Sequence, residues 1–95
     1  MKKDSVEFKK RVFDLMNGSL DLEKYPVPES KIVENEYEEG KVCGVLYREV
    51  YYANRRVCEK LGVEEDSDVE IIIRNLLEIA EYQSLKMYDY GRTFS

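Results

Sequence analysis

Residues 40–62 read GKVCGVLYREVYYANRRVCEKLG, and this stretch decides the fold because its apolar and small residues recur at helical spacing. They alternate steps of four and three, the spacing that brings side chains onto one face of an amphipathic helix. Gly62 follows the last of them, and a glycine just beyond a helix commonly forms a left-handed cap. The pattern therefore predicts a helix that ends at Leu61. Its seam, extended upstream at the same spacing, comprises Val33, Tyr37, Gly40, Gly44, Tyr47, Tyr51, Asn54, Cys58 and Leu61.

The upstream spacing carries this predicted helical region back to about Glu29. Gly40 and Gly44 then lie inside it, and each glycine lowers helix stability by about 1 kcal/mol relative to alanine. Gly40 is therefore a candidate break between a short acidic helix and the main helix. A strand over residues 42–47 is the alternative, because periodicity does not exclude a strand over so short a run. The residues that broaden the seam on one side are Cys43, Leu46, Val50, Ala53 and Val57.

Two further helices are predicted from capping boxes, in which a polar side chain and a glutamate three residues later satisfy free amide groups. The first box is DSVE at residues 4–7, where Asp4 opens a helix that ends near Gly18. The second box is SDVE at residues 67–70, and its helix runs to Tyr90 with Gly91 beyond its end.

The last predicted helix carries two apolar stripes when its residues are placed at 100° intervals. The broad one comprises Val69, Ile72, Ile73, Leu76, Leu77, Ile79, Ala80, Met87 and Tyr88. The narrow one comprises Ile71, Tyr82 and Leu85. A helix of this kind either lies centrally or meets a partner, and a homodimer through the second and third helices would cover both the seam and the second stripe.

Residues 19–28 separate the first two helical regions and contain Pro26 and Pro28. A residue before proline avoids helical angles, so Tyr25 and Val27 should be extended. A chain of 95 residues suits one domain. The sequence therefore predicts a single all-α domain over residues 1–95, a small three- to four-helix bundle with a long central helix and an extended proline-containing strap.

The residue inventory argues against catalysis, cofactors and metals. Histidine is absent, which removes the usual general base and the commonest transition-metal ligand. Cys43 and Cys58 would lie roughly 22 Å apart on one helix at 1.5 Å per residue, so they should be reduced and packed. No phosphate-binding loop occurs, and residues 64–68 lack the glycine and distal glutamate of a calcium loop. We therefore expect no enzyme activity, no cofactor and no bound metal.

Membrane insertion and export are also not expected. The longest apolar run spans residues 42–47, whereas a membrane span needs roughly 20 residues. The N-terminal residues lack the apolar core of a signal peptide. These features predict a cytoplasmic protein without a membrane partner.

Charge is segregated along the chain, although the formal net charge is −5. One acidic block is Glu34, Glu36, Glu38 and Glu39, and another is Glu64, Glu65, Asp66 and Asp68. Either block could present spaced negative charge to a basic groove on another protein. The alternatives are a solvated face for the first block and stabilisation of a helix N-terminus for the second.

The stretch between these blocks is basic and aromatic. Tyr47 and Tyr51 fall within the apolar arc of the helix, where packing is the expected role. Arg48, Tyr52, Arg55 and Arg56 fall on the polar face and are candidate partner-binding residues, since tyrosine and arginine are enriched in binding hot spots. The alternative is stacking of Tyr52 on its own helix's arginines. Direct nucleic-acid binding by this face is the competing function, and a sequence pI near 4.8 argues against it.

In profile, the chain resembles the small, acidic, tyrosine-rich helical inhibitors of bacteriophages and mobile elements, which include DNA mimics and anti-CRISPR proteins. This resemblance of profile implies an inhibitor that binds a basic protein groove. The function predicted from the sequence is thus a non-catalytic protein–protein interaction module, with an inhibitor or mimic of nucleic acid as its more specific form.

Overall fold

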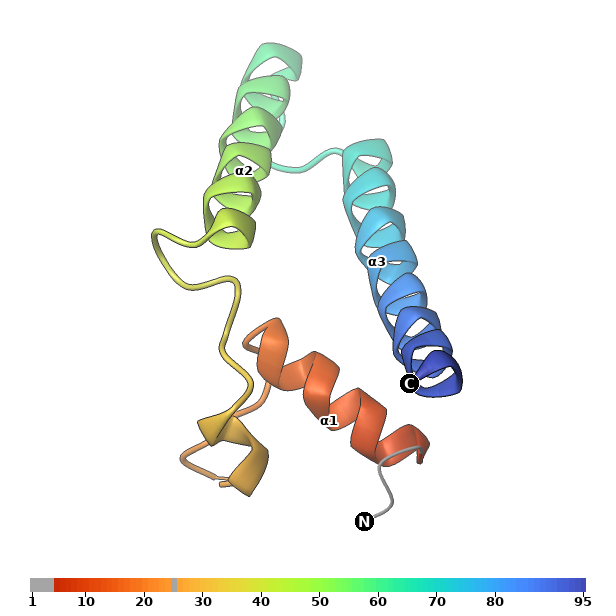
Figure 1. Cartoon of the computed structure of the whole chain (residues 1–95). Helices are drawn as coiled ribbons and strands as arrows, with labels where there is room; N and C mark the ends of the chain where they lie inside the picture. Colours follow the sequence, from red (N-terminus) through yellow and green to blue (C-terminus); the bar gives the residue numbers. More distant parts are fainter. Residues whose placement is uncertain (1–4, 25) are drawn as a thin grey trace.

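The computed structural model describes residues 5–24 and 26–95 and shows three α-helices in that part of the chain (Figure 1). They are α1 (Val6–Met16), α2 (Val42–Leu61) and α3 (Ser67–Phe94), and a 3₁₀ turn, η1 (Pro28–Lys31), lies between the first two. No strand occurs within the described ranges, so the predicted all-α class is confirmed. The longest helix is α3 rather than α2.

Helix α1 begins at a serine cap. The Ser5 Oγ accepts a hydrogen bond from the Phe8 amide at 3.1 Å, which satisfies one of the free donors at the helix start. The predicted capping residue, Asp4, and the predicted extended residue Tyr25 lie outside the described residues. The helix ends at Met16, and Gly18 follows with φ +76°, close to the predicted end.

The α-helical region predicted to begin near Glu29 is wrong as far as Lys41, because α2 begins at Val42. Val27 is extended, as predicted, but η1 covers only four residues and the chain then runs through turns to Lys41. Gly40 takes φ +87°, so the predicted break is confirmed, whereas the short acidic helix before it is wrong. Like charges at Glu34 and Glu38 oppose a helix there, and the Glu36 amide donates to the Met16 carbonyl at 2.6 Å instead. The alternative strand over residues 42–47 is also wrong, because these residues begin α2.

A tight connection joins α2 to α3 as a helical hairpin. Gly62 takes φ +73° and caps α2 as predicted, with its amide and that of Val63 donating to carbonyls of the last helical turn. Asp66 caps α3 by accepting from the amides of Asp68 and Val69 at 3.1 and 3.0 Å. The predicted box at residues 67–70 was therefore placed one residue late.

Helix α3 also continues beyond its predicted end at Tyr90. It passes through Gly91 and reaches Phe94. A glycine inside a helix lowers stability by only about 1 kcal/mol, and no proline follows to stop the helix. The Thr93 hydroxyl donates to the Asp89 carbonyl at 3.0 Å within this last turn.

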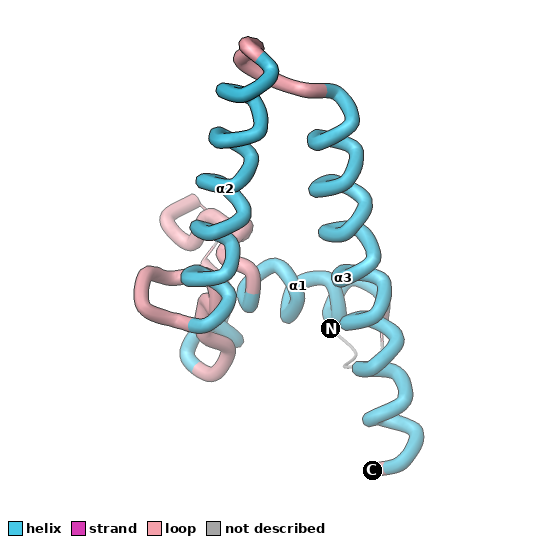
Figure 2. The backbone as a smooth tube through the Cα atoms, turned by 90° about the horizontal axis from the view of Figure 1, so that it is seen from above, coloured by secondary structure: helices cyan, strands magenta, loops and turns pink. Residues whose placement is uncertain are grey.

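The hairpin and α1 form two layers. Figure 2 shows α2 and α3 as the two arms of the hairpin, with α1 crossing on one side of them. Helix α1 packs against the C-terminal half of α3, where Lys9 pairs with Asp89 at 2.7 Å. The rings of Phe8 and Tyr88 lie 6.4 Å apart at the same contact. The segment between α1 and α2, which we call the strap from here on, covers residues 17–41 and leads back to the start of α2 (Figure 1).

This arrangement leaves the domain open. Its extents are 50 × 29 × 22 Å and its radius of gyration is 16.2 Å, whereas a compact domain of this length has about 12 Å. Among the described residues, only Leu15 and Cys58 are buried, at 4% and 0% exposure. One chain therefore does not enclose a core of the usual size.

Candidate functional site

Exposed apolar side chains lie along one face of α3. We call this face the α3 stripe, and its members are Ile72, Leu76, Ile79, Met87, Tyr90 and Phe94. These side chains are between 52% and 85% exposed. Helix α1 contacts Glu81, Tyr88 and Asp89 instead, and at 100° per residue these lie on the opposite face of α3. Helix α1 therefore leaves the α3 stripe uncovered.

A second line follows α2 at the same alternating spacing. This α2 stripe comprises Leu46, Val50, Ala53, Val57 and Leu61. Its four larger side chains are between 39% and 57% exposed. Most of these residues flank, on one side, the seam predicted from the sequence. In the structure their larger side chains are exposed to solvent.

The strap contacts α2 on a different face from the α2 stripe. The rings of Tyr37 and Tyr47 meet edge to face at 6.1 Å. Gly44 packs directly against the backbone carbonyls of Tyr37 and Glu38. The true inner residue near the hairpin tip is Cys58, which is fully buried and hydrogen-bonded through Sγ to the Asn54 side chain at 3.4 Å.

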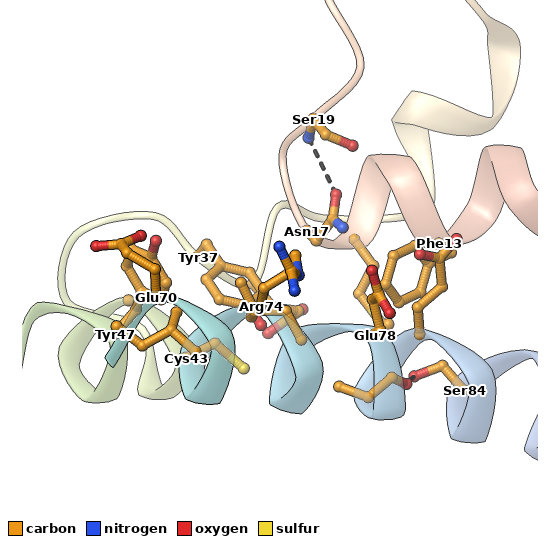
Figure 3. Close-up of a pocket in the computed structure, with 17 residues that line it drawn as sticks. Phe13, Asn17, Ser19, Tyr37, Cys43, Tyr47, Glu70, Arg74, Glu78 and Ser84 are labelled. Atoms are coloured by element: carbon orange, nitrogen blue, oxygen red, sulfur yellow. Dashed lines mark hydrogen bonds between the residues drawn. The ribbon is translucent and has the colours of Figure 1, made fainter. Parts of the chain in front are cut away.

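A cleft of about 970 Å³ opens between α1, the strap, α2 and α3. Figure 3 shows Tyr37 from the strap beside Arg74 of α3, and Phe13 from α1 beside Glu78 of the same helix. Glu70 and Glu78 add acidic groups along the same helix. No group of three Cys, Asp or Glu side chains in the described ranges could hold a metal ion. The prediction of a non-catalytic protein stays a prediction, since an open cleft of this kind does not test it.

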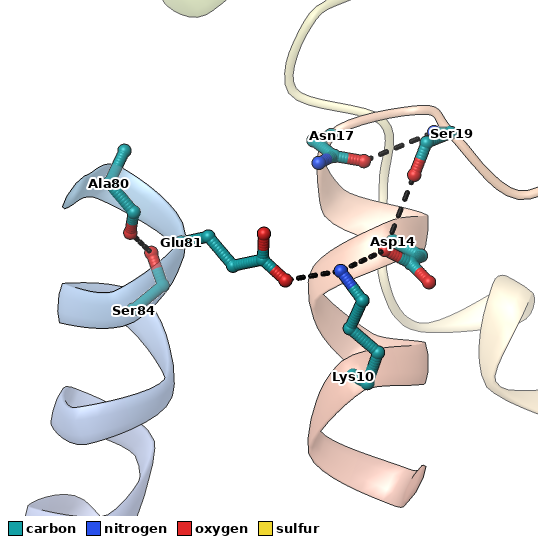
Figure 4. A network of polar contacts seen from close by, with 7 residues as sticks. All are labelled: Lys10, Asp14, Asn17, Ser19, Ala80, Glu81 and Ser84. Atoms are coloured by element: carbon teal, nitrogen blue, oxygen red, sulfur yellow. Dashed lines mark hydrogen bonds and ion pairs between the residues drawn. The ribbon is translucent and has the colours of Figure 1, made fainter. Parts of the chain in front are cut away.

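A polar network fixes α1 to α3 at one end of this cleft (Figure 4). Lys10 forms ion pairs with Glu81 of α3 and with Asp14 of its own helix, the latter at 3.3 Å. The hydrogen bond that the Lys10 ammonium donates to Glu81 is the main cause that raises the pKa of Lys10 above its usual value. Ser19 donates to Asp14 at 3.3 Å and extends the network into the strap. This cluster holds two helices together and needs no ligand.

The predicted arginine and tyrosine face lies on the surface of α2. Arg48 pairs with Glu39 at 3.2 Å, and Arg55 donates to the Glu64 carbonyl at 2.8 Å. Tyr52 meets the ring of Tyr51 edge to face at 5.4 Å. In the described part of the chain, no arginine stacks on Tyr52, so the intrahelical explanation of this face is not what the structure shows. Tyr52 and Arg56 both remain exposed to solvent.

The first acidic block is partly neutralised by neighbouring cations. Glu34 pairs with Lys41 at 2.7 Å, and this hydrogen bond lowers the pKa of Glu34 and raises that of Lys41. Glu39 pairs with Arg48, and Glu36 lines the cleft. The block therefore offers less free negative charge than its sequence suggests, although Glu38 is among its exposed members.

The second acidic block surrounds the start of α3. Asp66 is its cap, and Asp68 lies in the first turn, where negative charge stabilises the helix dipole. Glu64 accepts from Arg55 through its carbonyl, and Glu65 is exposed. These roles match the alternative that placed the block at a helix end, and partner binding by these residues stays a prediction.

The comparison with protein families, with curated proteins and with solved structures gives no match. In residues 5–24 and 26–95, no helix combines the length and the apolarity that crossing a membrane requires. The two stripes are thus the main guide to function. The sequence signal for the two stripes is the spacing at residues 46, 50, 53 and 57 and at residues 72, 76 and 79. From the sequence alone, these residues were assigned to wider apolar faces and were not separated from their neighbours.

Proposed function

We propose that this chain is a non-catalytic protein-binding module. The observation that carries the proposal is its large exposed surface, on which many large apolar side chains lie. The chain exposes 7784 Å², whereas a folded monomer of 11.2 kDa exposes about 5,700 Å². The excess of about 2,100 Å² is more than the roughly 800 Å² that each partner buries in a standard interface.

The α2 and α3 stripes supply the apolar part of this surface. Isolated exposed hydrophobic residues are ordinary, but many of them gathered on one face of each of two adjacent helices mark an interaction site. The partner must lie along both helices, because the stripes extend over most of their length. A protein surface meets this requirement better than a small ligand does.

The polar face of α2 is a second candidate contact within the same function. Tyr52 and Arg56 are exposed there, and residues of these types often dominate binding energy. The inhibitor and nucleic-acid-mimic form of the function has weaker support, because Lys41 and Arg48 already pair with the first acidic block. We therefore propose protein binding without assigning an inhibitory role.

Affinity capture from an extract of cells that produce the chain tests this function. Three baits are compared: the wild type, Ile79→Glu on the α3 stripe, and Ile71→Glu on the same helix outside it. We expect the wild type and Ile71→Glu to retain a protein that Ile79→Glu loses, because a charge on the stripe would have to be desolvated in the interface. Equal capture by all three baits would contradict the proposal.

The polar face is tested separately with the double variant Tyr52→Ala and Arg56→Ala, because Arg55 already donates to the Glu64 carbonyl. We expect capture to weaken at least about fivefold, the effect of losing about 1 kcal/mol at a hot spot, while the melting temperature stays nearly unchanged. If the double variant fails to fold, both residues are structural and the proposed role in binding is contradicted. A salt titration with short DNA and RNA addresses the competing function, and absence of binding at low salt would exclude it.

A further inference from the structure

We propose that the partner of the α2 and α3 stripes is a second copy of this chain, and that two hairpins pack face to face as a four-helix bundle. The inference rests on the proposed function, since it names the partner of the same apolar surface. It requires that both stripes lie on one side of the hairpin, that their area suits a dimer and that their flanking charges are compatible.

The contacts around each helix place the two stripes on the same side. On α3, the stripe lies opposite the residues that contact α1, as described above. On α2, Gly44, Tyr47 and Arg48 contact the strap, and the α2 stripe lies on the other side of the helix. Helix α1 lies on one side of the hairpin (Figure 2), so the uncovered stripes share the opposite side.

Two such faces can interlock. The α2 stripe follows steps of four and three residues, and so do the two parts of the α3 stripe on either side of Gln83, the spacing of helices that pack at a shallow angle in antiparallel bundles. A hairpin contributes two stripes, and a second hairpin supplies the two that complete a four-helix core. The dimer would therefore create the enclosed core that one chain lacks.

The area agrees with an obligate homodimer. Two chains together carry an excess of total surface of about 4,200 Å², of which the stripes are one part, and obligate homodimer interfaces bury roughly 2,000–5,000 Å². Such interfaces are also more hydrophobic than transient ones. The valine, leucine and isoleucine content of the two stripes fits that class.

Charge favours one arrangement of the two copies. Near the hairpin tip, Arg56 and Lys60 flank the outer edge of the α2 stripe, and Asp68 flanks the outer edge of the α3 stripe. A two-fold axis parallel to the helices sets α2 of one copy against α3 of the other, with both loops at the same end. This arrangement brings opposite charges together and makes all neighbouring helices antiparallel.

Light scattering after size-exclusion chromatography of the purified full chain tests the dimer. We expect a molar mass of 22.4 kDa, twice the 11.2 kDa of one chain. Val50→Glu on the α2 stripe should give the monomer mass. Val45→Glu is the matched control, since both valines lie on α2 with 42% and 47% exposure but on different faces. A monomeric wild type, or a folded Val50→Glu that remains dimeric, would overturn the inference.

A second measurement on the wild type covers the case in which Val50→Glu does not fold. The melting temperature of an obligate dimer rises with protein concentration, because association stabilises the folded state by mass action. A melting temperature independent of concentration would overturn the dimer. If the wild type is monomeric but stripe-dependent capture from extract persists, this inference fails and the protein-binding function stands.

The pairing of α2 with α3 has its own test. Lys60→Glu should weaken the dimer several-fold in a dilution series, because it sets a like charge beside Asp68 of the second copy. Adding Asp68→Lys to the same chain should restore most of the lost affinity. A double variant no tighter than Lys60→Glu would overturn the proposed arrangement of the helices.

Discussion

Gly44→Ala should lower the free energy of unfolding by about 2 kcal/mol, the range in which overpacking of a tight site usually falls. A Cβ at this position would collide with the backbone carbonyl of Glu38 and would approach that of Tyr37 to 2.7 Å. Backbone atoms cannot relieve this clash by changing rotamer, so the strap would have to move away from α2. The Tyr37–Tyr47 ring contact should then be lost as well.

Gly91→Ala is the matched control for this substitution. Gly91 lies inside α3, and a Cβ built there meets no atom within 4 Å. Alanine is favoured over glycine in a helix interior by about 1 kcal/mol, so this variant should be slightly more stable than the wild type. Urea denaturation measures both changes at one protein concentration. Equal effects of the two substitutions would show that the strap does not pack against Gly44.

Leu15→Ala should lower the free energy of unfolding by about 2 to 4 kcal/mol, as is typical when a buried leucine is truncated. Leu15 is one of two buried side chains among the described residues, and it lies on α1 between the cleft-lining residues Phe13 and Met16. The loss of its contacts should loosen α1 from the hairpin. Amide exchange in α1 should rise more than exchange in α2.

Leu22→Ala provides the control, since it removes the same atoms from a side chain that is 43% exposed. We expect a change below about 1 kcal/mol, because most surface substitutions fall in that range. Chemical denaturation of both variants compares the two sites directly. A similar loss at Leu22 would mean that α1 is not the element held by buried packing.

The sequence predicts helices well where local signals agree. The spacing after Gly40 and the glycine at 62 define α2, and both are confirmed by the structure. The segment before Gly40 was predicted as helix because its spacing continues the same pattern. Its real path depends on contacts with distant residues, such as the hydrogen bond from Glu36 to Met16 and the approach of the strap to Gly44. Local periodicity carries no information about such contacts.

The candidate site could be predicted only in part, because it also depends on contacts between distant residues. Periodicity identified apolar faces on the second and third helices, but it did not show which part of each face another element would cover. Cys58 and Val57 are neighbours in one apolar arc, yet the structure buries the first and exposes the second. Local pairing also changed the charge pattern, because Glu39 and Arg48 belong to regions that the sequence treated as separate.

The burial of Cys58 gives the hairpin tip a built-in chemical reporter. Its thiol is free and fully shielded, whereas the thiol of Cys43 is free and half-buried at the other end of α2. An alkylating reagent can reach Cys58 only when the structure around it opens, so the rate of labelling measures how often the hairpin tip opens. Labelling of Cys43 in the same molecule follows the cleft end of α2. One native chain thus records the local opening of both ends of a helix without any added probe.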